Sequence, residues 1–265
     1  MTRPAKTDST QAFSELAEAY SRARPQYPDL LWSTLRERLD HHPVPHSAID
    51  VGSGTGIATR QLARALPGWR VVGVEPGEAM RAAAARDSSD TAIEFRFGTA
   101  EDMPLKTSSA GLVLAAQALH WFNHACFYAE AHRVLAPRGL IGIMQNDRAL
   151  ALSPFLEDYE SFLEEHSPGY TRDYRDFDIV SELSDAGFSE VSRLSTAWTR
   201  SLSHDLFVDL ALSSSKMHAA AQQLGEAETA RRLQALLNRH HPSGELGIPY
   251  VSELFIGRHH LGRHD

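Results

Sequence analysis

The sequence contains a single cysteine, Cys126, among its 265 residues, so no disulfide can form within the chain. Proteins of reducing compartments typically lack disulfides. The first residues lead into no apolar run of signal-peptide length, and no stretch is long enough to cross a bilayer. These absences predict a cytoplasmic protein that makes no contact with a membrane.

Positive charge is also scarce, because 26 Lys and Arg stand against 34 Asp and Glu, which gives a net charge of -8. Non-specific nucleic-acid binding depends on neutralising phosphates with Lys and Arg, and the sequence has no basic stripe. Internal repeats and low-complexity tracts are absent as well. A small-molecule partner is therefore expected and nucleic acid is not, while the oligomeric state is left open.

One glycine-rich stretch organises the rest of the chain. Residues 48–51 form a short apolar run, Gly52, Gly54 and Gly56 follow at alternate positions, and apolar residues then recur at helical spacing through residues 57–66. Glycines tolerate positive φ and allow a ligand to approach the backbone. Such a turn also directs the first N–H groups of the helix toward a ligand. The pattern predicts a strand, a ligand-binding turn and a helix.

The glycine spacing discriminates between cofactors. A dinucleotide site has the pattern G-x-G-x-x-G, whereas this turn reads G-x-G-x-G and continues with Ile57. The next strand, residues 70–74, ends on Glu75, whose carboxylate can accept hydrogen bonds from both ribose hydroxyls. Pyrophosphate requires the longer turn, but a nucleoside without phosphate does not. The spacing therefore favours S-adenosylmethionine and disfavours an NAD-dependent oxidoreductase.

Strands and helices alternate between residues 48 and 148, which predicts an α/β fold with a doubly wound parallel sheet. The predicted strands are 48–51, 70–74, 93–97, 111–116, 140–144, 191–198 and 251–256, the last of them at a sheet edge. The predicted helices are 13–20, 30–39, 57–66, 78–85, 123–135, 154–163, 179–186, 203–212 and 226–240. We expect a single domain over 1–265. Within it, 1–40 is an N-terminal helical lid, 41–150 the cofactor-binding core, and 151–265 an acceptor cap with the last strands.

Polar residues follow several predicted strands, at the sheet edge where ligands of this fold class bind. Ala100 leaves room beside a flat ring, and Glu101 or Asp102 can accept a hydrogen bond from an exocyclic amine. His120 can act as a base or an orienting donor near neutral pH, and the face of Trp121 can attract a sulfonium. No metal site is expected, because no H-E-x-x-H pattern occurs.

Several motifs together resemble the class I S-adenosylmethionine-dependent methyltransferases, and more narrowly the type 11 small-molecule group that includes trans-aconitate methyltransferases. These motifs are Arg24-Pro25-Gln26-Tyr27-Pro28, the 50–56 turn, Glu75-Pro76, Gly98-Thr99-Ala100-Glu101, residues 116–122 and residues 133–139. The resemblance implies a Rossmann-like sheet of seven strands, with the last strand antiparallel. The sequence departs from the family pattern at Thr99, where many relatives carry Asp, and at Gln145, where an aromatic residue is frequent.

The resemblance and the strand-end positions together give a set of candidate site residues. For the cofactor they are Tyr20, Arg24, Asp50, Gly52, Ser53, Gly54, Gly56, Glu75, Pro76, Ala100, Glu101 and Gln117. For acceptor binding they are Trp121, Asn146 and Arg22, and for catalysis His120 and Arg148.

The acceptor is expected to be methylated on oxygen, with a carboxylate slightly preferred over a hydroxyl. A carboxylate needs positioning rather than a base, and Arg148, or Arg22, could hold it through paired hydrogen bonds. A hydroxyl requires proton removal, for which His120 is the natural base. The alternatives are C- or N-methylation of a natural-product-like metabolite, or a protein that binds S-adenosylmethionine or S-adenosylhomocysteine without catalysis.

Overall fold

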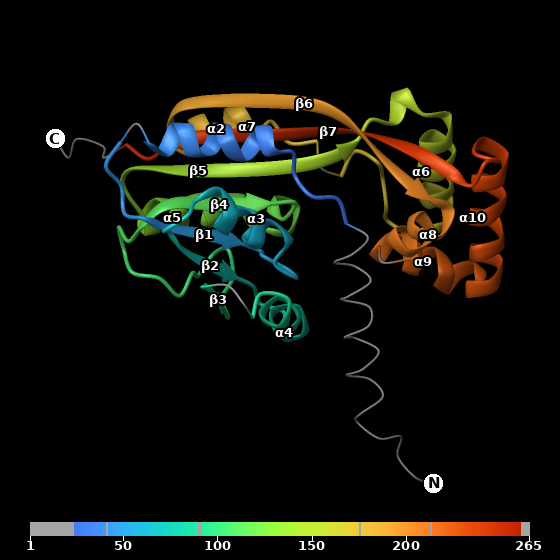
Figure 1. Ribbon diagram of the computed structural model, residues 1–265, viewed down its shortest axis with the longest axis horizontal. Coiled ribbons are helices and arrows are strands. Elements are labelled where there is room, and N and C mark those ends of the chain that lie inside the picture. Colours follow the sequence, from blue (N-terminus) through green and yellow to red (C-terminus); the bar gives the residue numbers. More distant parts are fainter. Residues whose placement is uncertain (1–23, 41, 90–91, 175, 213, 261–265) are drawn as a thin grey trace, which may run out of the picture. The chain divides into compact units, whose positions relative to one another are not determined.

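The computed structural model describes residues 24–40, 42–89, 92–174, 176–212 and 214–260 (Figure 1). Its strands form one seven-stranded sheet in the order β3-β2-β1-β4-β5-β7-β6. The strands are β1 (Ser47–Val51), β2 (Arg70–Val74), β3 (Ile93–Arg96), β4 (Ala110–Ala116), β5 (Leu135–Arg148), β6 (Ser189–Ser203) and β7 (Glu245–Arg258). The α-helices are α2 (Asp29–Asp40), α3 (Ile57–Ala65), α4 (Glu78–Arg86), α5 (His124–Val134), α6 (Pro154–His166), α7 (Ile179–Asp185), α8 (His204–Leu212), α9 (Ser215–Leu224) and α10 (Glu226–His240). Two short 3-10 helices are η1 (Leu119–Trp121) and η2 (Leu150–Leu152).

The sheet confirms the predicted doubly wound class. Strands β1, β2, β3, β4 and β5 pair in parallel, and β7 runs antiparallel, as the resemblance implied. The expected edge position of the last strand is wrong, because β7 lies between β5 and β6. Its last five residues, Leu254 to Arg258, are all buried, whereas β6 alternates between exposed and half-buried residues as an outer strand does.

The described residues form two compact units. The core unit contains Gln26–Asn146, Phe177–Thr196 and residues 252–260. The helical unit contains Asp147–Asp176 and Ala197–Val251, together with residues 24–25. Each unit is described by itself below.

Alternate residues of the central strands supply two apolar clusters in the core unit. Val113 of β4 joins one cluster with Phe127 of α5, while Leu112 of the same strand joins the other with Leu31 of α2 and Leu62 of α3. Because successive side chains of a strand point to opposite faces, helices cover both sides of this sheet. The arrangement leaves the strand ends free to carry a site.

The helical unit has its own apolar core, built mainly from α6, α8, α9 and α10. Phe155 and Tyr159 of α6, Phe207 of α8 and Leu233 of α10 belong to one buried cluster. Helix α6 begins as predicted, because the Ser153 hydroxyl caps its first turn. The short alanine-rich helix α9 was not predicted from the sequence. Among the described residues, no helix combines the length and apolar character that a membrane span requires.

Candidate functional site

The turn between β1 and α3 depends on glycine at three positions. Gly52, Gly54 and Gly56 have φ values of +68°, +54° and +79°, in the left-handed region that other residues rarely adopt. A Cβ on Gly52 would lie 2.7 Å from Ala118 Cβ, so this position is also sterically closed. A Cβ on Gly54 would meet no atom of the described residues within 4 Å. The backbone at Gly54 therefore borders open space.

Glu75 directly follows β2 beside this turn, and each oxygen of its carboxylate accepts a backbone hydrogen bond. Oε2 accepts a hydrogen bond from the Gly54 N–H at 3.0 Å, and Oε1 accepts one from the Gly77 N–H at 2.8 Å. The backbone carbonyls of Glu75 and Pro76 in turn accept hydrogen bonds from Arg81. Glu75 is thus fixed against the glycine turn, and its predicted role in binding the ribose stays a prediction.

Three buried polar atoms around the turn have no hydrogen-bond partner among the described residues: Asp50 Oδ1, Ser53 Oγ and Thr55 Oγ1. The other oxygen of Asp50, Oδ2, accepts a hydrogen bond from the Thr59 hydroxyl at 2.6 Å. A buried polar group without a partner loses the free energy of its hydration, so each such group calls for an explanation, and a bound ligand or water can supply one. Their clustering at one turn indicates a built ligand site.

Burial also perturbs the ionisation of Asp50. It raises the pKa of this carboxyl to about 7; the Thr59 hydrogen bond lowers it, and the nearby Glu75 carboxylate raises it further. A cation placed beside Asp50 would favour the charged form. The turn is therefore suited to a ligand that carries a positive group.

Arg60 and Phe95 support the turn and were missed by sequence analysis. The Arg60 guanidinium donates to the Thr55 carbonyl at 2.8 Å. The Phe95 ring lies so close that a Cβ on Gly56 would meet its Cζ at 2.9 Å. Arg60 lies one helical turn after Gly56, a spacing that could have pointed to it.

Ala100 and Glu101 lie in the loop after β3. Ala100 is buried, which fits a small residue beside a flat ring. The Glu101 carboxylate accepts a hydrogen bond from the Asn123 N–H at 2.9 Å. Burial raises the pKa of Glu101, but the hydrogen bond from Asn123 and further hydrogen bonds lower it more. The pKa therefore lies below its usual range. Glu101 thus supports the start of α5, where the Asn123 side chain caps the helix as predicted.

Gln117 and Asn146 meet at the ends of β4 and β5. Gln117 has a positive φ of 53°, and its side-chain amide donates to the Asn146 carbonyl. The Asn146 side chain donates to the Gln26 carbonyl at 3.3 Å and accepts from the Ser252 hydroxyl. Asn146 thus connects Gln26, Gln117 and Ser252 of the core unit, and its predicted role in substrate binding stays a prediction.

His120 and Trp121 lie in η1, directly after β4. Their rings are 5.0 Å apart between centroids. His120 is half-buried, whereas Trp121 is 76% exposed. Phe122, the next residue, instead packs against Phe127 of the core. The structure thus presents a histidine at the carboxyl end of a central strand, where the sequence placed it.

Arg148 and Arg24 belong to the helical unit. Arg148 Nη1 lies 3.4 Å from Glu160 Oε1, and its guanidinium stacks over the Tyr159 ring at 5.1 Å. Burial raises the pKa of the Tyr159 phenol, and the positive charges of Arg148 and Arg24 offset only part of that rise. Glu160 was not among the predicted site residues, although an acid on the apolar face of α6 was a readable signal. The predicted Tyr20 and Arg22, and residues 1–23 of the predicted lid, lie outside the described residues.

The described residues contain no group of three or more His, Cys, Asp or Glu arranged to hold a metal ion. The sheet order, the three left-handed glycines and the acidic end of β2 define a Rossmann-like protein with a nucleoside-type binding turn.

Comparisons with known proteins agree with this class. A family model described as a methyltransferase domain matches residues 49–143. An uncharacterized methyltransferase of Mycobacterium tuberculosis is 31% identical over 255 residues, which cover 93% of this chain and 95% of that protein. A methyltransferase of Dictyostelium discoideum is 34% identical over 136 residues, about half of each chain (51% and 49%).

Among solved structures, a type II methyltransferase from Anaeromyxobacter dehalogenans is similar, with a TM-score of 0.68 and 26% identity, over 90% of this chain and 99% of that one. The chain belongs to the S-adenosylmethionine-dependent methyltransferases.

Proposed function

We propose that this methyltransferase modifies an oxygen atom of a small-molecule acceptor. The observation that carries the proposal is the pairing of a cofactor turn with unsatisfied buried atoms and a histidine at the end of the neighbouring central strand, β4. The chain has no excess of positive charge that would suit a nucleic-acid acceptor. The resemblance to small-molecule methyltransferases points the same way.

The residues of the turn fit S-adenosylmethionine. Glu75 would hold the ribose hydroxyls, and Ala100 would lie beside the adenine. Asp50, Ser53 and Thr55 would pair with polar groups of the methionine part, whose ammonium suits the Asp50 carboxyl. The bare backbone of Gly52, Gly54 and Gly56 would allow close approach. When bound, S-adenosylmethionine supplies an electrophilic methyl group on a sulfonium.

The acceptor oxygen defines two roles for this chain's residues. If the acceptor is a hydroxyl, His120 would take its proton as a general base. If it is a carboxylate, no base is needed, and Arg148 or Arg22 would orient it. Trp121 would offer its exposed ring as an apolar contact, and the roles of Tyr20 and Arg24 toward the cofactor stay predictions.

The test is a transfer assay with isotopically labelled S-adenosylmethionine and a panel of small acids, phenols and alcohols, read by mass spectrometry. A label on an acceptor oxygen supports the proposal. If the purified protein binds the cofactor but labels only carbon or nitrogen, or labels nothing, the proposed O-methylation is wrong.

His120→Ala then tells a hydroxyl acceptor from a carboxylate. With a hydroxyl, turnover at pH 7 should fall about 10²–10⁴-fold and recover at high pH, where the acceptor ionises unaided. With a carboxylate, the same substitution should lower the rate only modestly, whereas Arg148→Ala should raise the acceptor KM sharply.

A further inference from the structure

Asp50 is a buried acid in the middle of the sheet of the core unit. It is 1% exposed, and β1 pairs it with Gly73 of β2 on one side and with Leu114 of β4 on the other. Its neighbours in β1, Ile49 and Val51, are buried apolar residues. A carboxylate in such a position destabilises the fold unless polar or charged groups compensate it. Asp50 therefore calls for partners.

The partner that the structure supplies is Thr59, in the first turn of α3. Thr59 is fully buried, and its hydroxyl donates to Asp50 Oδ2 at 2.6 Å. A threonine in a helix can instead donate to the carbonyl four residues earlier. Here that carbonyl, of Thr55, accepts a hydrogen bond from Arg60 Nη1 at 2.8 Å. The Thr59 hydroxyl thus serves the carboxylate of β1.

The two oxygens of the Asp50 carboxylate consequently differ. Oδ2 has the Thr59 hydroxyl, whereas Oδ1 is buried without a hydrogen-bond partner among the described residues. An ionised carboxylate can accept hydrogen bonds at both oxygens. Oδ1 is therefore the oxygen that is left for a ligand, and it belongs to the same turn as the unsatisfied hydroxyls of Ser53 and Thr55.

Two groups act on the charge of Asp50 besides its burial: the Thr59 hydroxyl of α3 and the Glu75 carboxylate after β2. Burial raises the pKa of Asp50, the Thr59 hydrogen bond lowers it, and Glu75 raises it, so that it lies at about 7. Of these influences, the Thr59 hydrogen bond alone favours the ionised carboxylate. Without that hydroxyl, the pKa would lie higher and the ionised form would be scarcer at neutral pH.

We propose that Thr59 is a positioning residue of the cofactor site, whose hydroxyl holds the Asp50 carboxylate ionised and leaves Oδ1 for the ammonium of the cofactor's methionine part. This inference rests on the pairing of Asp50 with that ammonium in the proposed function. Thr59 then acts on the amino-acid end of the cofactor alone. The nucleoside end, assigned to Glu75 and Ala100, does not depend on it.

The test compares two probes, S-adenosylhomocysteine and 5′-methylthioadenosine, which share the nucleoside and differ in the amino-acid part. Both are titrated calorimetrically into the full chain between pH 6 and pH 9. Thr59→Val keeps the branched side chain and removes the hydroxyl. It should lower S-adenosylhomocysteine affinity at pH 6.5 at least about fivefold and move the midpoint of its pH dependence up by about one pH unit or more. Affinity for 5′-methylthioadenosine should stay within about threefold of wild type, and Thr59→Ser should keep the wild-type midpoint.

The matched control is Thr229→Val in α10, where another fully buried threonine donates its hydroxyl to the Gly225 carbonyl at 2.9 Å. It should leave the affinities for both probes unchanged. The inference is overturned if Thr59→Val weakens both probes equally, if it leaves the midpoint in place, if Thr229→Val produces the same loss, or if wild type does not bind S-adenosylhomocysteine. If Thr59→Val does not fold, Thr59→Ala removes the same hydroxyl and is held to the same outcomes.

Wild type by itself gives a further check, because its affinity should rise with pH for S-adenosylhomocysteine and not for 5′-methylthioadenosine. An equal pH dependence for the two probes would overturn the inference while leaving O-methylation possible. No acceptor is present in these titrations. A failure to transfer methyl groups to oxygen would therefore contradict the proposed function and leave the titrations interpretable.

Discussion

The glycine turn of the core unit and the Glu160 pair of the helical unit treat their buried polar groups in opposite ways. In the core unit, Asp50, Ser53 and Thr55 each have a buried atom without a partner among the described residues. In the helical unit, Glu160 has one partner in Arg148 and a second in Tyr170. The first arrangement is incomplete without a ligand or water, whereas the second is already paired. A cluster of buried atoms without partners at one turn can thus mark a ligand site, whereas a buried ion pair that satisfies itself gives no such signal.

Among the substitutions that test this comparison, Gly52→Ala is expected to have the largest effect on cofactor affinity. The substitution would place an alanine in the left-handed region of backbone conformation. Its Cβ would lie 2.7 Å from Ala118 Cβ, so the turn must shift. Cofactor affinity should fall by 100-fold or more, about 3 kcal/mol. Calorimetric titration with S-adenosylhomocysteine measures it.

The matched control is Gly169→Ala in the helical unit, where φ is +78° and a Cβ meets no atom of the described residues within 4 Å. It should lower the free energy of unfolding by about 1–2 kcal/mol and leave cofactor affinity unchanged. Equal losses of affinity in both variants would mean that the glycine turn is not the cofactor site.

A second, smaller effect is expected from Glu75→Ala. It removes a charged acceptor of two ribose hydrogen bonds, each worth about 1.5–3 kcal/mol, so affinity should drop by a few kcal/mol at most. The same titration measures the change. An unchanged affinity would remove Glu75 from the site.

The ionisation of Asp50 predicts that cofactor affinity depends on pH, with a smaller effect than that of Glu75→Ala. Its folded pKa of about 7 lies above the ordinary 3.8, so its proton stabilises the unliganded fold at low pH, and that contribution is lost as pH rises from about 4 through 7. Binding of a positive ligand group requires the ionised form. Affinity should therefore rise roughly tenfold between pH 6 and pH 8, with release of a proton.

Titrations in buffers of different ionisation enthalpy would count that proton. Asp50→Asn should lose this pH dependence, and Asp209→Asn, a change of the same type in the helical unit, should keep it. If the Asp50→Asn variant retains the full dependence, another group is responsible.

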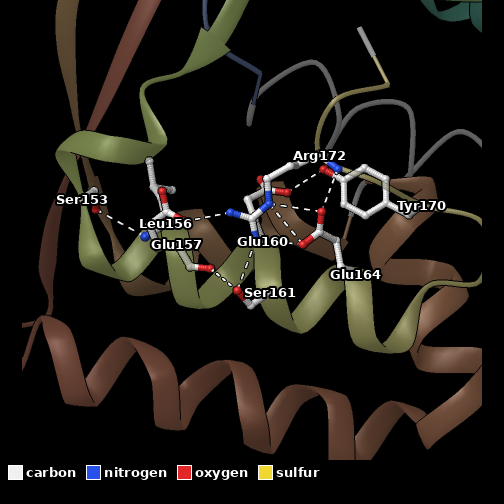
Figure 2. Close-up of polar contacts among 8 residues, drawn as sticks. All are labelled: Ser153, Leu156, Glu157, Glu160, Ser161, Glu164, Tyr170 and Arg172. Carbon is white, nitrogen blue, oxygen red and sulfur yellow. Dashed lines mark hydrogen bonds and ion pairs between the residues drawn. The ribbon is translucent and has the colours of Figure 1, made fainter. Parts of the chain in front are cut away.

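The smallest effect is expected from Arg172→Met, which releases residues 167–174, the segment after α6, from Glu157 and Glu164 of that helix (Figure 2). Ion pairs that remain partly exposed contribute little, so the free energy of unfolding should fall by about 1 kcal/mol or less. Cofactor affinity should not change. Arg231→Met, which removes a surface pair with Glu228, is the control for lost charge. If the Arg172 variant alone lost cofactor affinity tenfold, the 167–174 segment would contribute to cofactor binding, contrary to this prediction.

The sequence predicts those elements of the fold that depend on residues close together in the chain. The turn at 52–56, the caps Asn123 and Ser153, and the apolar run of β4 each depend on neighbouring residues, and the structure confirms the elements they predicted. The position of β7 depends on pairing with strands over 40 residues away, and the edge prediction failed there.

The same distinction between local and long-range dependence applies to the candidate site. The neighbours of Glu75 were predictable because the turn and the end of the next strand come together in every parallel pair of this kind. The partner of Arg148 was not, because Glu160 is brought to it only by the packing of α6. Roles for Tyr20 and Arg22 stay predictions.

The most direct test of the account is hydrogen–deuterium exchange of the full chain with and without S-adenosylmethionine. The cofactor should complete the glycine turn of the core unit and leave α6 and the segment after it, residues 154–174, unchanged. The account predicts protection in residues 52–60 and 75–78, with no change in 154–174. Protection confined to 154–174, with an unaffected turn, would contradict it.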